Sequence, residues 1–463
     1  MRSQNSGERT VIKDPSARVL DTANTPLPRV ALLGGAPYST LISNAGGGIS
    51  KYGDIAINRW RVDATRDSYG QWCYLRDVAS GKVWSAAHQP ICSDTLWYRA
   101  TLDDECVTFD RRDGDFETHT EIVVPQGVAA EVRRVTVTNR SKDDARIELT
   151  SYQEVVLAPI LSDRGHRAFG NLFVQTEWLP DRNSLLAMRR PRSAVMKPVW
   201  CGHTIAVDGV SGAVTCETDR SIFVGRGRSQ QNPAAMDKPG DLAGTVGAVL
   251  DPILALRTTL TIPAGKSASA IFVTFHANDR DDATRLAEQF SEFKTVKEYF
   301  DTVSPNEPSS VDTTVYQNLA GILLFGATSN NDSAPGSEIK GDRRDLLALG
   351  LTGEFPILLA RIGTSGSSGM VAELVDLHRY WCLKGVDCDL VIITDDTRGS
   401  TKLQGEVSLL VSPGGDADEM KRAGGVFVLD VSEINPKQTA ALNTAARMRI
   451  DCDRDTLSEV ANG

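Results

Sequence analysis

The stretch between Tyr38 and Pro90 combines the residue types that proteins use to bind sugars. Its tryptophans are interleaved with arginine, aspartate, asparagine and glutamine. An indole ring packs on the apolar C–H face of a pyranose, while guanidinium, carboxylate and amide groups hydrogen-bond the hydroxyls. The side chains that we take as carbohydrate-binding candidates are Asn58, Arg59, Trp60, Arg61, Asp67, Trp72, Arg76, Asp77 and Trp84.

The same residue types have a structural alternative. Tryptophans usually pack in the core of a sandwich, and neighbouring arginines and aspartates can satisfy each other. Residue types alone favour this alternative. Only the three-dimensional arrangement of these side chains can distinguish a sugar site from core packing.

The sequence shows no complete catalytic or metal-binding motif. It contains no GxSxG nucleophile elbow, no HExxH motif, and no CxxC pair among its eight cysteines. Acidic residues are numerous, but the carboxylate pair of a glycosidase is defined by its separation in space and not by sequence spacing. We therefore expect no catalytic residue, no metal ligand and no cofactor.

Two loops allow a ligand-binding interpretation. The segment Gly46-Gly47-Gly48 matches neither GxxxxGK[ST] nor GxGxxG, and no helix pattern follows it directly. A tight turn between strands is therefore favoured over a phosphate loop. The second loop, 219–228 with Asn232 and Pro233 after it, either reaches a ligand or another domain, or is solvated.

The elements that position these residues are mainly β-strands. Apolar and polar residues alternate with period two in the segments 132–139, 145–152, 171–178 and 267–275. Strands of this length, separated by turn signals, predict stacked antiparallel sheets. The expected fold is mainly β, with a large antiparallel super-sandwich followed by helices and a small α/β domain.

The pattern changes near residue 280. Helices are predicted over 281–290, 311–326 and 370–384. Residues 329–345 are predicted as a loop. Short apolar strands over 355–360, 388–394 and 425–429 predict a small mixed or parallel sheet. The expected domains are a tail or linker over 1–36, the super-sandwich over 37–278, a helical linker over 279–345 and the small α/β domain over 346–463.

Charge and hydropathy exclude several classes of partner. The formal net charge of −10 argues against broad binding to nucleic acid or to an anionic membrane, because both need a basic face. No apolar run approaches the roughly 20 residues of a membrane-spanning helix, and the N-terminus lacks the apolar region of a signal peptide. Scattered cysteines are typical of reduced core residues. We expect a cytoplasmic protein without a membrane span.

Several segments, taken in order along the chain, carry a resemblance to a known family. They are 38–52, 58–61, 63–67, 74–77, 83–90, 223–228 and 244–253. These segments resemble the N-terminal sandwich of cyclic β-1,2-glucan synthases and β-1,2-oligoglucan phosphorylases, which belong to glycoside hydrolase family 94, formerly glycosyltransferase family 36. A looser similarity to later family segments covers 350–361 and 378–392, with departures at 341–344 and 348–351.

The resemblance implies a larger enzyme. In the family, the sandwich precedes an (α/α)₆ barrel that carries the catalytic aspartate and the phosphate site. No helical array of that kind is predicted over 280–463, so we carry over no catalytic residue. The implied partners are a β-glucan, β-1,2-linked, and a catalytic barrel domain or separate chain; the implied location is the cytoplasm or an inner-membrane synthase complex.

These implications leave three hypotheses of function. The first is a non-catalytic, carbohydrate-associated portion of such an enzyme, truncated or split, that binds glucan or docks on the barrel. The second is an active glycosyltransferase or phosphorylase acting on β-1,2-glucan. The third is an inert truncated remnant that folds but binds nothing.

Overall fold

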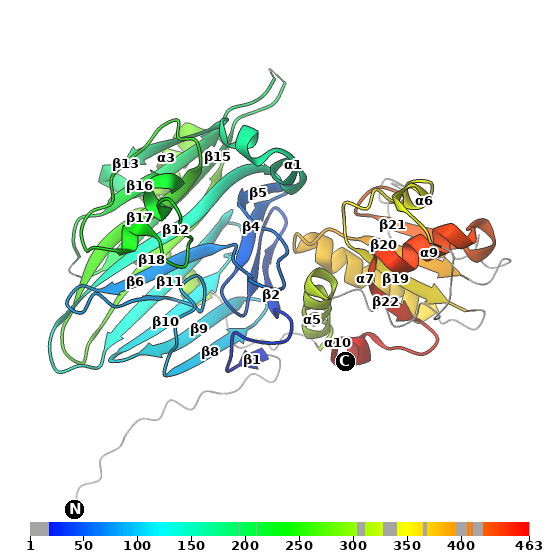
Figure 1. The fold of residues 1–463 in the computed structure, drawn as a ribbon, viewed down its shortest axis with the longest axis horizontal. Coiled ribbons are helices and arrows are strands. Elements are labelled where there is room, and N and C mark those ends of the chain that lie inside the picture. Colours follow the sequence, from blue (N-terminus) through cyan, green and yellow to red (C-terminus); the bar gives the residue numbers. More distant parts are fainter. Residues whose placement is uncertain are drawn as a thin grey trace, which may run out of the picture.

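The structure is a computed structural model of the 463-residue chain. Figure 1 shows a large β-sandwich beside a smaller α/β unit. The residues that the structure describes are 18–193, 195–209, 211–302, 311–326, 340–363, 368–394, 405–407, 409–410 and 420–462.

The first sheet of the sandwich has nine strands, and each neighbouring pair is antiparallel. Their spatial order is β1 (Arg18–Leu20), β8 (Trp97–Leu102), β9 (Cys106–Asp113), β10 (Phe116–Val123), β11 (Ala130–Asn139), β18 (Ser267–Ala277), β15 (Val199–Asp208), β14 (Ser184–Arg189) and β13 (Val174–Leu179).

The second sheet is also antiparallel, and its longest strand is β12 (Ala145–Pro159). The order along the sheet is β16 (Thr215–Asp219), β17 (Pro252–Ile262), β12, β5 (Ile55–Asn58), β4 (Gly48–Tyr52), β3 (Tyr38–Ser43) and β2 (Val30–Gly35). Two more strands extend from β12: β6 (Gln71–Asp77) pairs with it, and β7 (Val83–Ser85) pairs with β6.

The sandwich core lies between the two sheets. Strand β9 shows the expected alternation, because every second side chain is buried. Fully buried residues from both sheets, such as Leu75, Val135, Leu149 and Leu254, form one apolar cluster. These observations confirm the prediction of a mainly β, antiparallel super-sandwich. The predicted turn at the glycine triplet is confirmed as well, since it joins β3 to β4 with Gly46 at φ +94°.

Two helices cover the outer face of the first sheet. Asp279 caps α3 (Arg280–Ser291) by accepting a hydrogen bond from the backbone of Asp282, and α4 (Phe293–Thr302) follows. Their buried side chains, Phe290 among them, pack on Phe275 and other residues of β18. These helices lie on the sandwich, although their sequence falls within the expected helical linker.

Helix α5 (Val311–Phe325) lies between the sandwich and the α/β unit (Figure 1). Its residues Leu319 and Leu323 are fully buried in a cluster that also contains Leu32 of β2 and Trp381 of the α/β unit. Arg18 of β1 donates hydrogen bonds to Asn318 and Gln317 of the same helix. The two units therefore share a core, and α5 is part of it.

The α/β unit contains a four-stranded parallel sheet with the order β21 (Val426–Asp430), β20 (Asp389–Thr394), β19 (Ile357–Ile362) and β22 (Ala446–Asp451). The predicted small sheet is thus confirmed as parallel. All six residues of β20 are buried, as a central parallel strand requires. Helices of this unit include α6 (Arg343–Leu347), α7 (Ser368–Leu383), α9 (Pro436–Ala445) and α10 (Leu457–Asn462).

Three local expectations differ from the structure. Residues 18–35, placed in an N-terminal tail, supply β1 and β2, while residues 1–17 lie outside the described residues. The predicted loop 329–345 ends in α6, which an Asp342–Asp345 capping box begins; residues 327–339 are not described. The predicted strand 171–178 begins only at Val174, because Asn171 ends α1 (Ile160–Asn171) and Leu172 and Phe173 form a turn.

The remaining elements are short and lie in the connections of the sandwich and the α/β unit. They are the helix α2 (Arg220–Val224) and the 3₁₀ turns η1 (Pro180–Arg182), η2 (Ala234–Met236) and η5 (Val431–Glu433).

Candidate functional site

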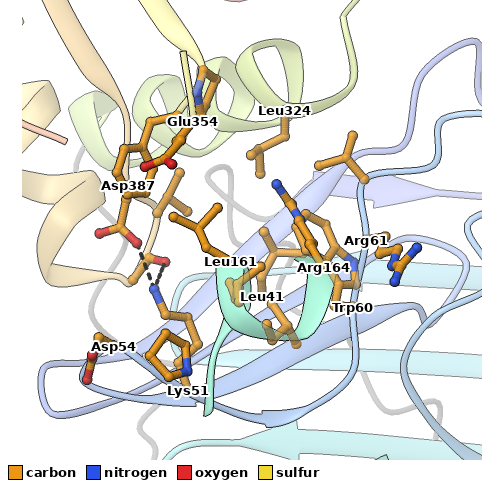
Figure 2. A pocket seen from close by; sticks show the side chains of 18 of the residues that line it. Leu41, Lys51, Asp54, Trp60, Arg61, Leu161, Arg164, Leu324, Glu354 and Asp387 are labelled. Atoms are coloured by element: carbon orange, nitrogen blue, oxygen red, sulfur yellow. Dashed lines mark hydrogen bonds and ion pairs between the residues drawn. The ribbon is translucent and has the colours of Figure 1, made fainter. Parts of the chain in front are cut away.

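A cavity of 710 Å³ opens where the sandwich meets the α/β unit. Figure 2 shows its wall from β3, β4, α1 and α5 on the one side and from loops of the α/β unit on the other. Part of the lining is apolar, including Leu41, Trp60, Leu161, Leu324 and Phe355. The charged residues of the lining are Lys51, Asp54, Arg61, Arg164, Glu354, Lys384, Asp387 and Arg447.

Strand β5 and the backbone after it place Trp60 in this wall. Asn58, the last residue of β5, accepts a hydrogen bond from the backbone of Ser50 (2.7 Å) and donates one to the carbonyl of Gly48 (3.0 Å). The Trp60 ring then packs edge-on against Phe325 of α5, with centroids 6.1 Å apart, and remains 7% exposed. Trp60 therefore exposes only a small part of its side chain to the cavity.

An ion pair fixes the opposite side of the cavity. Lys51 Nζ on β4 lies 2.9 Å from an Asp387 carboxylate oxygen and donates to the carbonyl of Gly385 at 3.0 Å. A backbone hydrogen bond from Ala36 to Leu383 adds a second link between the two units. The two walls are thus held together by contacts between residues more than 330 positions apart.

Helix α1 supplies Leu161 and Arg164 to the cavity, and Arg59 anchors this helix. The Arg59 guanidinium is fully buried and donates to Asp163 of α1 (2.9 Å), to Glu154 of β12 (2.7 Å) and to Asn171 at the end of α1 (2.9 Å). Arg59 thereby links β12 to α1. It does not line the cavity itself, but it fixes the position of the helix that does.

The charge network around Arg59 controls the ionisation of Glu154. Burial alone would raise the pKa of this carboxyl, but the charges of Arg59, Arg167 and Arg220 outweigh it and lower the pKa to about 2. Asp251 completes the network by accepting hydrogen bonds from Arg167. Glu154 is therefore a structural carboxylate whose proton is lost throughout the physiological range.

The structure places seven of the nine sequence-based candidates in buried positions, with Arg61 and Asp77 intermediate. Of the nine, Trp60 and Arg61 line the cavity between the units. The other seven serve contacts within the sandwich, and the structure does not bring them together into one exposed site.

The buried tryptophans illustrate this difference. Trp84 is fully buried, stacks on Phe116 with centroids 5.6 Å apart, and donates to the Thr118 hydroxyl at 3.2 Å. Trp72 is 3% exposed and belongs to an apolar cluster with Tyr74. A ring in such a position has no face for a sugar from solution, because both strands are covered on both sides.

The polar candidates likewise have their partners within the sandwich. Arg76 is buried and lies 3.2 Å from Glu148 in an ion pair, although its Nε and Nη2 atoms make no hydrogen bond among the described residues. Asp77 accepts backbone hydrogen bonds in the turn that follows β6. Asp67 accepts a hydrogen bond from the Ser43 hydroxyl beneath the glycine turn. Burial, opposed by this hydrogen bond, raises the pKa of Asp67 to about 6.

A second cavity of 380 Å³ lies on the sandwich and has a polar lining. The loop 219–228 contributes Arg220, which donates to Glu154 at 2.7 Å, and Gln230 of the following segment donates to the same carboxylate at 2.9 Å. This loop therefore packs on its own sandwich, where Arg167, Arg220 and Glu154 neutralise one another.

Sequence reasoning missed most of the lining of the larger cavity. Leu161 and Arg164 lie on a helix within a region of predicted strands, and Glu354 and Asp387 come from the α/β unit. Lys51 lies in a segment that carries the sandwich resemblance, and Glu354 and Asp387 lie in the looser resemblance over 350–361 and 378–392. This family resemblance was the one available signal. No spacing in the sequence relates residues so distant along the chain.

Comparison with known proteins decides the family. Residues 13–293, more than half of the chain, match the family model described as glycosyl hydrolase 94, supersandwich domain. The chain belongs to the glycosyl hydrolase 94 family. The match confirms the resemblance found in the sequence and agrees with the two stacked antiparallel sheets.

Curated relatives of this glycosyl hydrolase 94 chain are longer. The cyclic beta-(1,2)-glucan synthase NdvB of Rhizobium meliloti (strain 1021) is 29% identical over 393 residues, which are 82% of this chain and 14% of the relative. N,N'-diacetylchitobiose phosphorylases of Vibrio proteolyticus and Vibrio furnissii are 29% and 28% identical over 35% and 47% of this chain. The chain spans 21% and 27% of the length of these two relatives.

Membrane spans and metal sites are two further kinds of feature to consider in the described residues. Within the residues that the structure describes, no helix is long and apolar enough to cross a bilayer. Over the same described ranges, no group of three or more His, Cys, Asp or Glu side chains is arranged to hold a metal ion.

Proposed function

We propose that this glycosyl hydrolase 94 chain is a non-catalytic, carbohydrate-binding portion of a β-glucan-processing enzyme, and that the cavity between its two units holds the glucan. The observation that carries this proposal is the mixed lining of the 710 Å³ cavity, where Trp60 and Arg61 meet apolar and charged residues of α1 and of the α/β unit. The similarity to a cyclic beta-(1,2)-glucan synthase supports a β-1,2-linked glucan as the ligand.

The chemistry of the lining suits a sugar chain. The volume lies within the roughly 300–1,000 Å³ of ligand sites in proteins. Leu41, Leu161 and Phe355 offer apolar surface for the C–H faces of pyranoses, while the charged side chains around them can hydrogen-bond hydroxyls. In the second cavity, by contrast, Glu154, Arg167 and Arg220 are occupied by one another.

Calorimetric titration of the full chain with β-1,2-linked gluco-oligosaccharides tests the proposal, with β-1,3- and β-1,4-linked chains for comparison. Leu161→Asp should weaken binding by about tenfold, because it replaces partly exposed apolar wall with a charge that has to be desolvated. Leu172→Asp is the matched control, since Leu172 is also exposed and follows α1 but lies outside the cavity.

Each outcome of this titration has a defined meaning. Binding that Leu161→Asp weakens and Leu172→Asp preserves supports the proposal. A folded chain that gives no heat at millimolar oligosaccharide favours the inert remnant. Release of glucose 1-phosphate from glucan and phosphate by the purified chain would instead favour the active phosphorylase.

A second candidate function is docking on a catalytic barrel, as part of the same enzyme. Phe169 and Leu172 are about half exposed, and Arg192 stacks 5.3 Å from the centroid of Phe169 and 5.0 Å from that of Phe173. Exposed aromatic and arginine side chains of this kind are enriched in protein interfaces. Co-elution of the chain with a separately purified barrel domain, abolished by Phe169→Asp, is the expected result; co-elution unaffected by Phe169→Asp would contradict docking through this surface.

A further inference from the structure

The charges inside the cavity between the two units are separated. Figure 2 shows Asp54, Glu354 and the Lys51–Asp387 pair towards one side and Arg61 and Arg164 beside Trp60 on the other. Five basic and three acidic side chains line the cavity, although the whole chain carries a net charge of −10. The end of the cavity at Arg61 and Arg164 is therefore a local positive region on an acidic protein.

The two arginines at this end have no protein acceptor among the described residues. Neither forms an ion pair or a hydrogen bond there, and the Nε atom of Arg61 is buried without a partner. Arginines buried elsewhere in the sandwich lie beside a carboxylate or donate to a carbonyl oxygen; examples are Arg59, Arg111, Arg133 and Arg257. Arg76 also has a buried Nε without a hydrogen bond, but it lies 3.2 Å from the Glu148 carboxylate, whereas Arg61 has no carboxylate beside it among the described residues. A buried N–H without an acceptor costs free energy that a bound ligand can recover.

The two guanidinium groups also act on each other. Arg164 reaches solvent at the mouth of the cavity, yet the protein around it and then the charge of Arg61 lower its pKa. Two like charges in contact with one cavity favour an anion between them. Guanidinium groups bind the oxygens of phosphate in paired, charge-assisted hydrogen bonds, which an uncharged hydroxyl matches less well.

We propose that Arg61 and Arg164 select a saccharide that carries a phosphate-type oxyanion, with the sugar lying against Leu161 and the exposed part of Trp60. This inference rests on the proposed sugar-binding function of the same cavity and names the class of sugar. The oxyanion takes the acceptor positions that the protein leaves vacant at Arg61, and the apolar wall next to it contacts the ring.

Calorimetric titration of the full chain at two salt concentrations tests the inference. The probes are glucose 6-phosphate, glucose, inorganic phosphate and a neutral β-1,2-linked gluco-oligosaccharide. Glucose 6-phosphate should bind at least tenfold more tightly than glucose or inorganic phosphate, and its affinity should fall with added salt. Arg164→Gln should weaken the binding of glucose 6-phosphate by about tenfold and that of the neutral oligosaccharide by a much smaller factor, because a glutamine amide can still hydrogen-bond a hydroxyl but cannot pair with an anion.

Two controls keep the result interpretable. Arg192→Gln removes an arginine outside the cavity and should change neither affinity. The melting temperature of unliganded Arg164→Gln should be equal to or above that of the wild type, because the variant removes repulsion with Arg61. A lower melting temperature would contradict the unpaired charge on which the inference depends.

The remaining outcomes separate this inference from the proposed function. Equal binding of glucose and glucose 6-phosphate, together with binding of the neutral oligosaccharide, overturns the anion selection alone. Inorganic phosphate that binds as tightly as glucose 6-phosphate shows an anion site without a sugar, and also overturns it. Tight binding of glucose 6-phosphate without any binding of the neutral oligosaccharide supports the anion site and overturns the proposed glucan function.

Discussion

Replacement of Arg59 by methionine should lower the free energy of unfolding at pH 7 by about 3–5 kcal/mol. The guanidinium is fully buried, and its removal leaves Asp163 without its cation while Glu154 keeps only Arg167 and Arg220. The unpaired carboxylate left in the interior destabilises the protein more than the loss of the attraction within the ion pair does. Urea unfolding followed by far-ultraviolet circular dichroism measures the effect.

A surface arginine provides the control for Arg59. Arg140 pairs with Glu117 at 2.6 Å, but its side chain is 51% exposed. Arg140→Met should therefore lower the free energy of unfolding by less than about 1 kcal/mol. An equal cost for both variants would show that the Arg59 network is not buried as the structure describes.

The same network predicts a pH dependence. The pKa of Glu154 is depressed to about 2 in the folded protein, so its contribution to stability is present above the unfolded pKa near 4.5. Between pH 4.5 and 2 the unfolded chain binds more protons than the folded one, and stability falls as the pH falls. The slope in this window should be shallower in Arg59→Met, because the pKa of Glu154 is less depressed there.

Trp381→Ala should lower the free energy of unfolding by about 3–5 kcal/mol as well. Trp381 of α7 is fully buried in the core that α5 shares with both units, and its indole N–H donates to the carbonyl of Tyr316 at 2.8 Å. Truncation leaves a cavity and removes the hydrogen bond of the indole at the same place. Thermal unfolding measured by calorimetry gives the size of the loss.

The control for Trp381→Ala is Trp97→Ala. The Trp97 side chain on β8 is 44% exposed, so its truncation should lower the free energy of unfolding much less. Because the shared core joins the sandwich to the α/β unit, we expect the wild type to unfold in one cooperative transition. Two separate transitions, with only the smaller one shifted by Trp381→Ala, would instead mean that α5 acts as a linker.

Much of this fold follows from local sequence patterns. The alternation in β9 and β11 shows which face is buried, because one side of each strand is more exposed than the other. The unbroken apolar run of β20 similarly predicts a strand covered on both sides. Helix α1 was missed because it is short, contains two glycines and is kinked at His166, so it shows little helical periodicity.

The site was less accessible to sequence reasoning. Tryptophan is the residue type that stacks on sugars, but Trp84 and Trp72 lie on strands that are buried on both faces, so their rings fill the core. In β12, charged residues such as Glu148 and Glu154 occupy buried positions. The hydropathy pattern of the sequence therefore does not show that this strand is buried on both faces. The cavity itself depends on contacts such as Lys51–Asp387, which arise only when the two units pack.

Hydrogen exchange of the full chain, with and without a β-1,2-linked gluco-oligosaccharide, tests the central claim most directly. If the cavity between the units holds the sugar, exchange should slow in the segments 353–357 and 384–387 and in the first turns of α1, which line that cavity. Segment 229–231, which lines the second cavity, should be unaffected. Protection confined to 229–231, or none in a sample that calorimetry shows to be saturated, would contradict the account.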